Sequence, residues 1–172
     1  SLRLDANGAW SVEEATDRFE ALYHQPLSGI EQPLARGNEE GLPQVHELAP
    51  APLYYDESLV TMGDAERLVG LGVADGFNIR VSKCGGLLPS LKLADYARRH
   101  GVAIQLGCMV GETSILSAAG RRFLELVPGV CFAEGWFGKF LVMRDVVKHP
   151  LRFRYGGRGS RLASAGLGVD VD

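Results

Sequence analysis

Three acidic residues stand at the ends of short hydrophobic runs, and their types and spacing suit metal chemistry. Asp5 ends LRLD, Glu31 ends LSGIE and Asp56 follows PLYY, at intervals of 26 and 25 residues. One strand, one helix and two loops fill such an interval, so the carboxylates would lie at the same end of neighbouring parallel strands. Carboxylate oxygens are the ligands that hard divalent cations such as Mg²⁺ take in proteins. The pattern indicates an enzyme rather than a binding module.

Each acidic motif taken alone has a second interpretation. Asn7 follows Asp5 by two residues, and on a strand both side chains would address one site, but Asp-Ala-Asn is also typical of a loop turn. The run Asp56-Glu57-Ser58 also suits a helix cap. The repeated interval is what favours the metal site over these separate readings.

Strand and helix patterns alternate along the chain. We expect strands over 2–6, 29–31, 53–55, 76–81, 102–106 and 130–133, and helices over 11–23, 39–48, 63–71, 88–100 and 114–126. Ser11 and Glu14 have the spacing of a capping box at the start of the first helix. Gly72 suits the C-cap of the third helix.

Strands that alternate with helices of this length predict βαβ units and a parallel sheet. The regular period favours a partial (β/α) TIM-type barrel over a doubly wound sheet, and such barrels hold their chemistry at the carboxyl ends of the strands. About six units are present where a barrel has eight, and residue 1 falls inside a strand. We therefore expect the first strands upstream, with 1–148 as the C-terminal part of the barrel and 149–172 as an irregular tail.

Charge and hydrophobicity limit the kinds of partner that we expect this chain to bind. The net charge is -3 and no Lys/Arg-rich stripe is present, so we expect no nucleic acid. No apolar run approaches the roughly 18 residues of a membrane span, so we expect no membrane contact. No signal peptide is visible, and we expect a cytoplasmic protein.

Six motifs occur in order through the chain: DAN at Asp5, IEQP at Glu31, YYDES at Asp56, NIRVSKCGG from Asn78, GCMVGET from Gly107 and the closing GLGVDVD. Over essentially its whole length the chain resembles the C-terminal barrel part of the enolase superfamily. It is close to the muconate-lactonizing-enzyme subgroup, which includes muconate cycloisomerases, o-succinylbenzoate synthases and dipeptide epimerases. The resemblance implies that Mg²⁺ assists removal of the proton α to a carboxylate and stabilises the enediolate.

The resemblance also implies what this chain would act with. We expect a small carboxylate substrate, a homo-oligomer, and a requirement for the missing N-terminal segment. That segment would include a capping domain, on which the tail 149–172 would pack.

The resemblance implies roles for individual acidic residues. Asp5, Glu31 and Asp56 would be the Mg²⁺ ligands. Asn7 and Glu57 stand beside ligands and would support them.

Two further acids lie in later loops. Glu112, after the fifth strand, matches a family acid near the substrate, although a carboxylate at a helix N-terminus is an equally simple interpretation. Glu134, after the sixth strand, lies where the family often places substrate-selecting residues.

The chain departs from the family at its catalytic lysines. The family carries a lysine pair one strand before Asp5, and this chain does not contain that strand. The family's other catalytic lysine falls at Arg80. Arginine stays protonated and is a poor general base, but it can stabilise an enolate or hold a carboxylate with two hydrogen bonds. Lys83 is a candidate replacement base, although strand alternation points it away from the Arg80 face unless the strand has ended.

These residues favour a reaction with one base, of the cycloisomerase or lyase type. A racemase or epimerase of amino acids or dipeptides is the alternative, and it needs a proton acceptor on each face of the α-carbon. Two other interpretations stay open. The chain could be a non-catalytic fragment that needs a complementary segment, or an intact metal site in which Arg80 serves a sugar-acid-type function.

Overall fold

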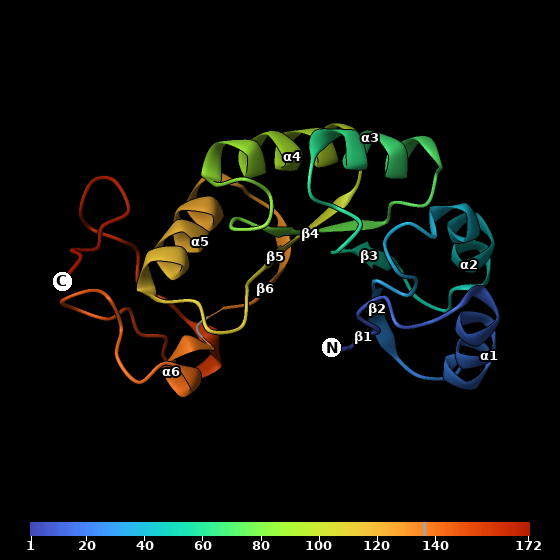
Figure 1. The fold of residues 1–172 in the computed structure, drawn as a ribbon, viewed down its shortest axis with the longest axis horizontal. Helices are drawn as coiled ribbons and strands as arrows, with labels where there is room; N and C mark the ends of the chain where they lie inside the picture. The colour runs from blue at the N-terminus through green and yellow to red at the C-terminus, as the bar shows by residue number, and fades with distance from the viewer. Residues whose placement is uncertain (136) are drawn as a thin grey trace. The chain divides into compact units, whose positions relative to one another are not determined.

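The computed structural model describes residues 1–135 and 137–172. In this part of the chain six strands form one sheet in the order β1-β2-β3-β4-β5-β6 (Figure 1). The strands are β1 Leu2–Asp5, β2 Leu27–Glu31, β3 Leu53–Tyr55, β4 Gly76–Arg80, β5 Ala103–Gly107 and β6 Val130–Ala133. β1 pairs with β2, β2 with β3, β3 with β4 and β5 with β6, all in parallel. The predicted α/β class and partial (β/α) barrel are confirmed.

Helices follow the strands at the expected places. They are α1 Val12–Leu22, α2 Leu42–Leu48, α3 Met62–Gly70, α4 Leu87–Arg99, α5 Ser114–Leu126 and α6 Gly138–Leu141, with 3-10 turns η1 Glu39–Gly41 and η2 Tyr155–Gly157. The capping box of α1 is confirmed, because Ser11 Oγ accepts from the Glu14 amide at 3.1 Å and Glu14 Oε2 accepts from the Ser11 amide at 2.9 Å. α1 and α2 lie side by side (Figure 1).

One expected helix is divided in two. The segment 39–48 forms η1 and then α2 rather than a single α-helix. Pro43 lies in the first turn of α2, and proline has no amide hydrogen to donate to the carbonyl four residues earlier. The α-helical hydrogen-bond pattern therefore cannot run through the junction. α6 and η2 were not expected from the sequence.

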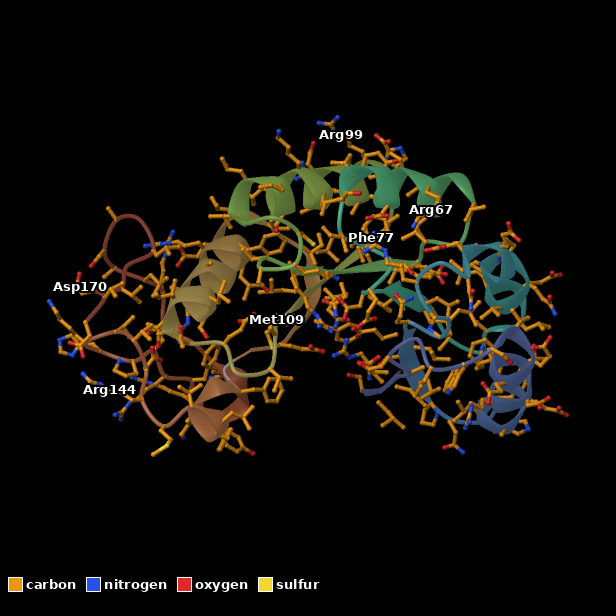
Figure 2. All side chains as sticks on the ribbon, in the orientation of Figure 1. Arg67, Phe77, Arg99, Met109, Arg144 and Asp170 are labelled. Carbon is orange, nitrogen blue, oxygen red and sulfur yellow. The ribbon has the colours of Figure 1, made fainter. Side chains whose placement is uncertain are left out.

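The chain divides into two compact units, each with its own core. Ser1–Asn78 and Asp95–Ala103 form the first unit, and Ile79–Ala94 and Ile104–Asp172 form the second. Fully buried side chains of the first unit include Phe19, Ile30, Leu53 and Phe77, the last of which is labelled in Figure 2. Those of the second include Ile79 and Phe123. Burying each such side chain contributes roughly 1.5–3 kcal/mol.

Tyr54 fixes the spacing of three strands in the first unit. It is paired in register with Gly76 of β4, and its ring covers Gly76 and Gly29 of β2. A Cβ on Gly29 would lie 2.9 Å from Tyr54 Cε2, and a Cβ on Gly76 would overlap the ring outright. Glycine is needed at both positions because the aromatic ring takes the space of a side chain.

The Gly76→Ala substitution is expected to destabilise the protein by about 1–3 kcal/mol, the usual cost of forcing a methyl group into a packed interior. Urea unfolding would measure it. Gly70→Ala is the matched control, because nothing lies within 4 Å of a Cβ at this last residue of α3. That change should be neutral or stabilise by up to about 1 kcal/mol. Equal stability of the two variants would contradict the packing role of Gly76.

Two arginines of α5 hold the C-terminal tail, within the second unit. The Arg121 guanidinium donates to the carbonyls of Arg152 at 2.7 Å and Ser160 at 3.0 Å, and it lies 4.5 Å from the centre of the Phe153 ring. Arg122 Nε donates to the carbonyl of Gly166 at 2.8 Å. The tail therefore contacts α5, and its packing on a capping domain stays a prediction. None of the helices in 1–135 and 137–172 is long and apolar enough to cross a membrane.

Candidate functional site

The three predicted metal ligands lie at the carboxyl ends of successive strands of the first unit. Asp5 and Glu31 are the last residues of β1 and β2, and they are partners in the strand register. Asp56 directly follows Tyr55, the last residue of β3. Glu31 pairs in turn with Tyr54 of β3. The parallel register therefore places all three carboxylates at the same edge of the sheet.

The environments of these carboxylates differ. Glu31 is 6% exposed and Asp56 is 1% exposed, whereas Asp5 is exposed. Asp5 Oδ1 accepts a hydrogen bond from the Asn7 amide at 2.8 Å. Glu31 Oε1 accepts from the side-chain amide of Asn78, and Glu31 Oε2 lies 4.0 Å from Arg3 Nη1.

The donor chemistry of this site fits a hard divalent cation. Carboxylate oxygens suit Mg²⁺, and two of the three carboxylates are buried, where a negative charge is costly without compensation. As the side chains are placed, however, the described residues hold no group of three or more His, Cys, Asp or Glu that could bind a metal ion. Asp5 bonds to its own turn and Glu31 to Asn78 instead. The assignment of Asp5, Glu31 and Asp56 as ligands therefore stays a prediction.

The structure decides between the strand and turn interpretations of the Asp-Ala-Asn motif. β1 ends at Asp5, and Asn7 adopts a positive φ of 48°, so strand alternation does not apply to it. The interpretation as a turn describes this segment, and Asn7 contacts Asp5 through its backbone amide.

The helix-cap interpretation of the third motif is wrong. The N-cap of α3 is Thr61, which forms a capping box with Asp64. Asp56 is therefore not needed as a cap. Glu57 is half-buried beside it, and its supporting role stays a prediction.

Sequence reasoning missed Asn78 as a residue of the site. Asn78 is fully buried on β4, and its side-chain amide donates to the Glu31 carboxylate. A signal was present, because Asn78 and Arg80 alternate in the run NIR and so share one face of a strand.

The candidate catalytic residues Arg80 and Lys83 belong to the second unit. β4 ends at Arg80, and the chain then turns, with the Cys84 amide donating to the Arg80 carbonyl at 2.9 Å. Strand alternation does not decide where Lys83 points, because Lys83 lies beyond the end of β4, which is the exception that the expectation allowed. Arg80 Nη1 lies 3.5 Å from the sulfur of Met109, which is labelled in Figure 2. The catalytic roles of both residues stay predictions.

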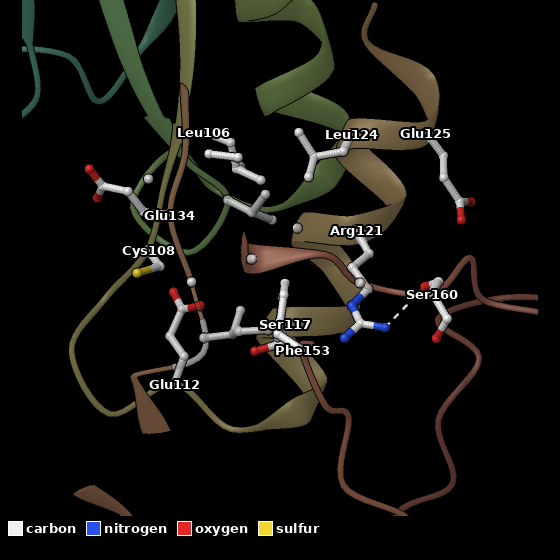
Figure 3. Close-up of a pocket in the computed structure, with 18 of the residues that line it drawn as sticks. Leu106, Cys108, Glu112, Ser117, Arg121, Leu124, Glu125, Glu134, Phe153 and Ser160 are labelled. Carbon is white, nitrogen blue, oxygen red and sulfur yellow. Dashed lines mark hydrogen bonds between the residues drawn. The ribbon is translucent and has the colours of Figure 1, made fainter. Parts of the chain in front are cut away.

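The second unit also contains a cavity of about 530 Å³ that Cys108, Glu112 and Glu134 help to line (Figure 3). Glu134 Oε1 accepts from Gln105 Nε2 at 3.1 Å. Glu112 Oε1 accepts from the Met109 amide at 2.7 Å, so its carboxylate stabilises its own turn rather than the first amides of α5.

Burial shifts the pKa values of two side chains that line this cavity. It raises the pKa of Glu112 above its ordinary value, although the Met109 hydrogen bond and Arg80 act in the opposite direction. Burial, with the nearby charges of Glu112 and Glu134, also raises the pKa of the Cys108 thiol to about 12. Cys108 is therefore a neutral thiol at physiological pH and a poor nucleophile.

The fold and the carboxylates at its strand ends define a class of protein: parallel (β/α)-barrel proteins with acidic residues at the carboxyl ends of their strands. The family model described as enolase C-terminal domain-like matches residues 1–172, so the chain belongs to this family.

Relatives in this family are enzymes. The chain is 39% identical over 119 residues to a hydrophobic dipeptide epimerase of Roseobacter litoralis, covering 69% of this chain and 34% of the relative. It is 31% identical over 171 residues to muconate cycloisomerase 1 of Rhodococcus opacus, covering 99% of this chain and 45% of the relative.

A solved enzyme structure is also similar to this chain. The dipeptide epimerase of Cytophaga hutchinsonii, complexed with Mg and the dipeptide D-Ala-L-Val, matches with a TM-score of 0.92 and 26% identity, over 100% of this chain and 46% of that one. The chain spans less than half the length of each of these three relatives.

Proposed function

We propose that this chain forms part of an enzyme that removes the proton α to a carboxylate, in a cycloisomerase or lyase reaction that depends on Mg²⁺. The observation that carries the proposal is the placement of Asp5, Glu31 and Asp56 at the ends of three successive parallel strands. The family membership adds to it.

Each residue has a defined part in this proposal. Asp5, Glu31 and Asp56 would hold the metal, and Asn78 orients Glu31 through its hydrogen bond. When bound, Mg²⁺ supplies positive charge that stabilises the negative charge developing on the substrate carboxylate. The Arg80 guanidinium would hold a carboxylate group of the substrate through two hydrogen bonds.

We assign the base to a segment outside this chain. The chain spans less than half of its relatives, and its own candidate, Lys83, follows the end of β4. The active form would then be the full-length protein, meaning the natural polypeptide that contains this chain. Glu112 and Glu134 would select the substrate from the cavity in the second unit.

Epimerisation of dipeptides is the second candidate. The observation in its favour is the identity of 39% to a hydrophobic dipeptide epimerase, against 31% to a muconate cycloisomerase. Arg80 argues against it, because an epimerase needs a proton acceptor on each face of the α-carbon and arginine does not accept protons at neutral pH.

Proton exchange in deuterated water separates the two candidates. The full-length protein would be incubated with Mg²⁺ and either muconolactone or the two epimers of a dipeptide, and deuterium at the α-carbon followed by NMR. A cycloisomerase should label the lactone and convert it to the open diacid. An epimerase should label both dipeptide epimers and interconvert them. If the full-length protein exchanged protons with neither class of substrate, with and without Mg²⁺, both candidate functions would be contradicted.

A further inference from the structure

Gln32 is a fully buried amide between the ends of β2 and β3. Its Oε1 accepts from the backbone amides of Asp56 at 3.0 Å and Ser58 at 3.1 Å. Its Nε2 donates to the Leu34 carbonyl at 2.7 Å and to Ser58 Oγ at 2.8 Å. An amide side chain offers two acceptor and two donor positions, so Gln32 uses all four.

The backbone of Gln32 adds two further connections. Its amide donates to the Tyr54 carbonyl of β3 at 2.8 Å, and its carbonyl accepts from the Gly8 amide, in the loop after β1, at 2.7 Å. One residue therefore bonds to the segments that carry all three predicted ligands, and it directly follows Glu31.

The conformation of Gln32 is unfavourable in isolation. Its φ is 39°, and the next residue is Pro33. Positive φ is uncommon for residues other than glycine, and a residue before proline prefers an extended backbone. Such a conformation persists when the surrounding structure over-determines it, and it clusters at functional sites. The six hydrogen bonds of Gln32 supply that constraint.

We infer that Gln32 is a positioning residue that fixes the loop of Asp56 against the strand end of Glu31, and so sets the spacing of two carboxylates. The side chain reaches the Asp56 amide directly, while the peptide bond joins it to Glu31. The consequence for metal affinity rests on the proposed function. The hydrogen bonds from Gln32 to the Asp56 loop do not depend on a bound metal.

Two variants of the full-length protein test this inference. Gln32→Met keeps the length of the side chain but removes its four hydrogen bonds. Gln32→Gly also removes them, while glycine accepts a positive φ without strain. Mg²⁺ affinity would be measured by calorimetry, and amide hydrogen exchange at Asp56 and Ser58 by NMR on the metal-free protein.

Two controls separate positioning from general stability. Gln44→Met makes the same substitution at an exposed position of α2. Val45→Ala opens the fully buried core beside it, so it should lower the melting temperature. Both controls should keep the Mg²⁺ affinity within twofold of the wild type.

Both Gln32 variants should accelerate exchange at Asp56 and Ser58 and weaken Mg²⁺ binding by about 10- to 100-fold, the range for groups that orient metal ligands. Unchanged amide hydrogen exchange at Asp56 and Ser58 would overturn the inference that Gln32 fixes this loop. Faster exchange with unchanged affinity would overturn the effect on the metal. If the wild type bound no Mg²⁺, the proposed function would fail, and exchange alone would decide whether Gln32 fixes the loop.

Discussion

The Asp56→Asn variant of the full-length protein is expected to bind Mg²⁺ at least about 100-fold more weakly than the wild type. Losing a residue that only orients a metal ligand usually weakens binding by about 10- to 100-fold, and losing a ligand itself should weaken it further. Asparagine keeps the shape of the side chain but removes its negative charge. Asp56 is 1% exposed, so water screens little of that charge. Calorimetric titration with Mg²⁺ measures the effect, and substrate exchange should fall with it.

The stability of the metal-free protein is a second, independent measurement on the same variant. Asparagine keeps the shape of the side chain and carries no charge to desolvate, so metal-free Asp56→Asn should stay folded, with a stability close to that of metal-free wild type. Asp17→Asn, on the exposed face of α1, is the matched control and should change neither property. Equal Mg²⁺ affinity in wild type and Asp56→Asn would remove Asp56 from the ligand set.

The Arg80→Lys variant of the full-length protein is expected to gain the second proton acceptor that epimerisation needs, and so to exchange the α-proton in both epimers of a dipeptide. Lysine can lose its proton and act as a base where arginine cannot, and a positioned general base contributes about 10²- to 10⁴-fold to a rate. We therefore expect α-proton exchange in the dipeptide epimer that the wild type exchanges more slowly to rise by at least about 100-fold. Deuterium labelling of each epimer, followed separately by NMR, would measure it.

A matched substitution tests whether this gain is local. Arg98→Lys replaces an exposed arginine of α4 that pairs with Asp95, and it should leave labelling unchanged. The Mg²⁺ affinity of Arg80→Lys should also equal that of the wild type. If Arg80→Lys labels no second epimer, Arg80 is a substrate-binding group and the scaffold lacks a geometry for two bases.

Local patterns made the elements predictable. The strand 130–133 and the helix 114–126 were predicted with the bounds observed for β6 and α5. Hydrophobic periodicity and cap residues act over a few neighbours, so the sequence carries them directly. The single helix predicted over 39–48 was wrong because Pro43 interrupts the hydrogen-bond pattern.

The positions of the predicted ligands were also readable from the sequence. Because the strands are parallel and regularly spaced, Asp5 and Glu31 had to end neighbouring strands, and the register pairs them. Asn78 and Gln32 were not identified, because their partners lie 47 and 24 residues away in the chain. Such contacts depend on side-chain rotamers and on how the strands pair.

The sequence by itself determined the order of the βα units, the family and the acidic residues at the strand ends, because each depends on residue type and spacing. Only the tertiary structure decided which groups touch these acids. It brought the Asn7 backbone amide to Asp5, the Asn78 side-chain amide to Glu31 and the Gln32 side-chain amide to the backbone of Asp56. The reason is physical: a buried polar group must find its partners within hydrogen-bond distance, and only the folded chain brings them there.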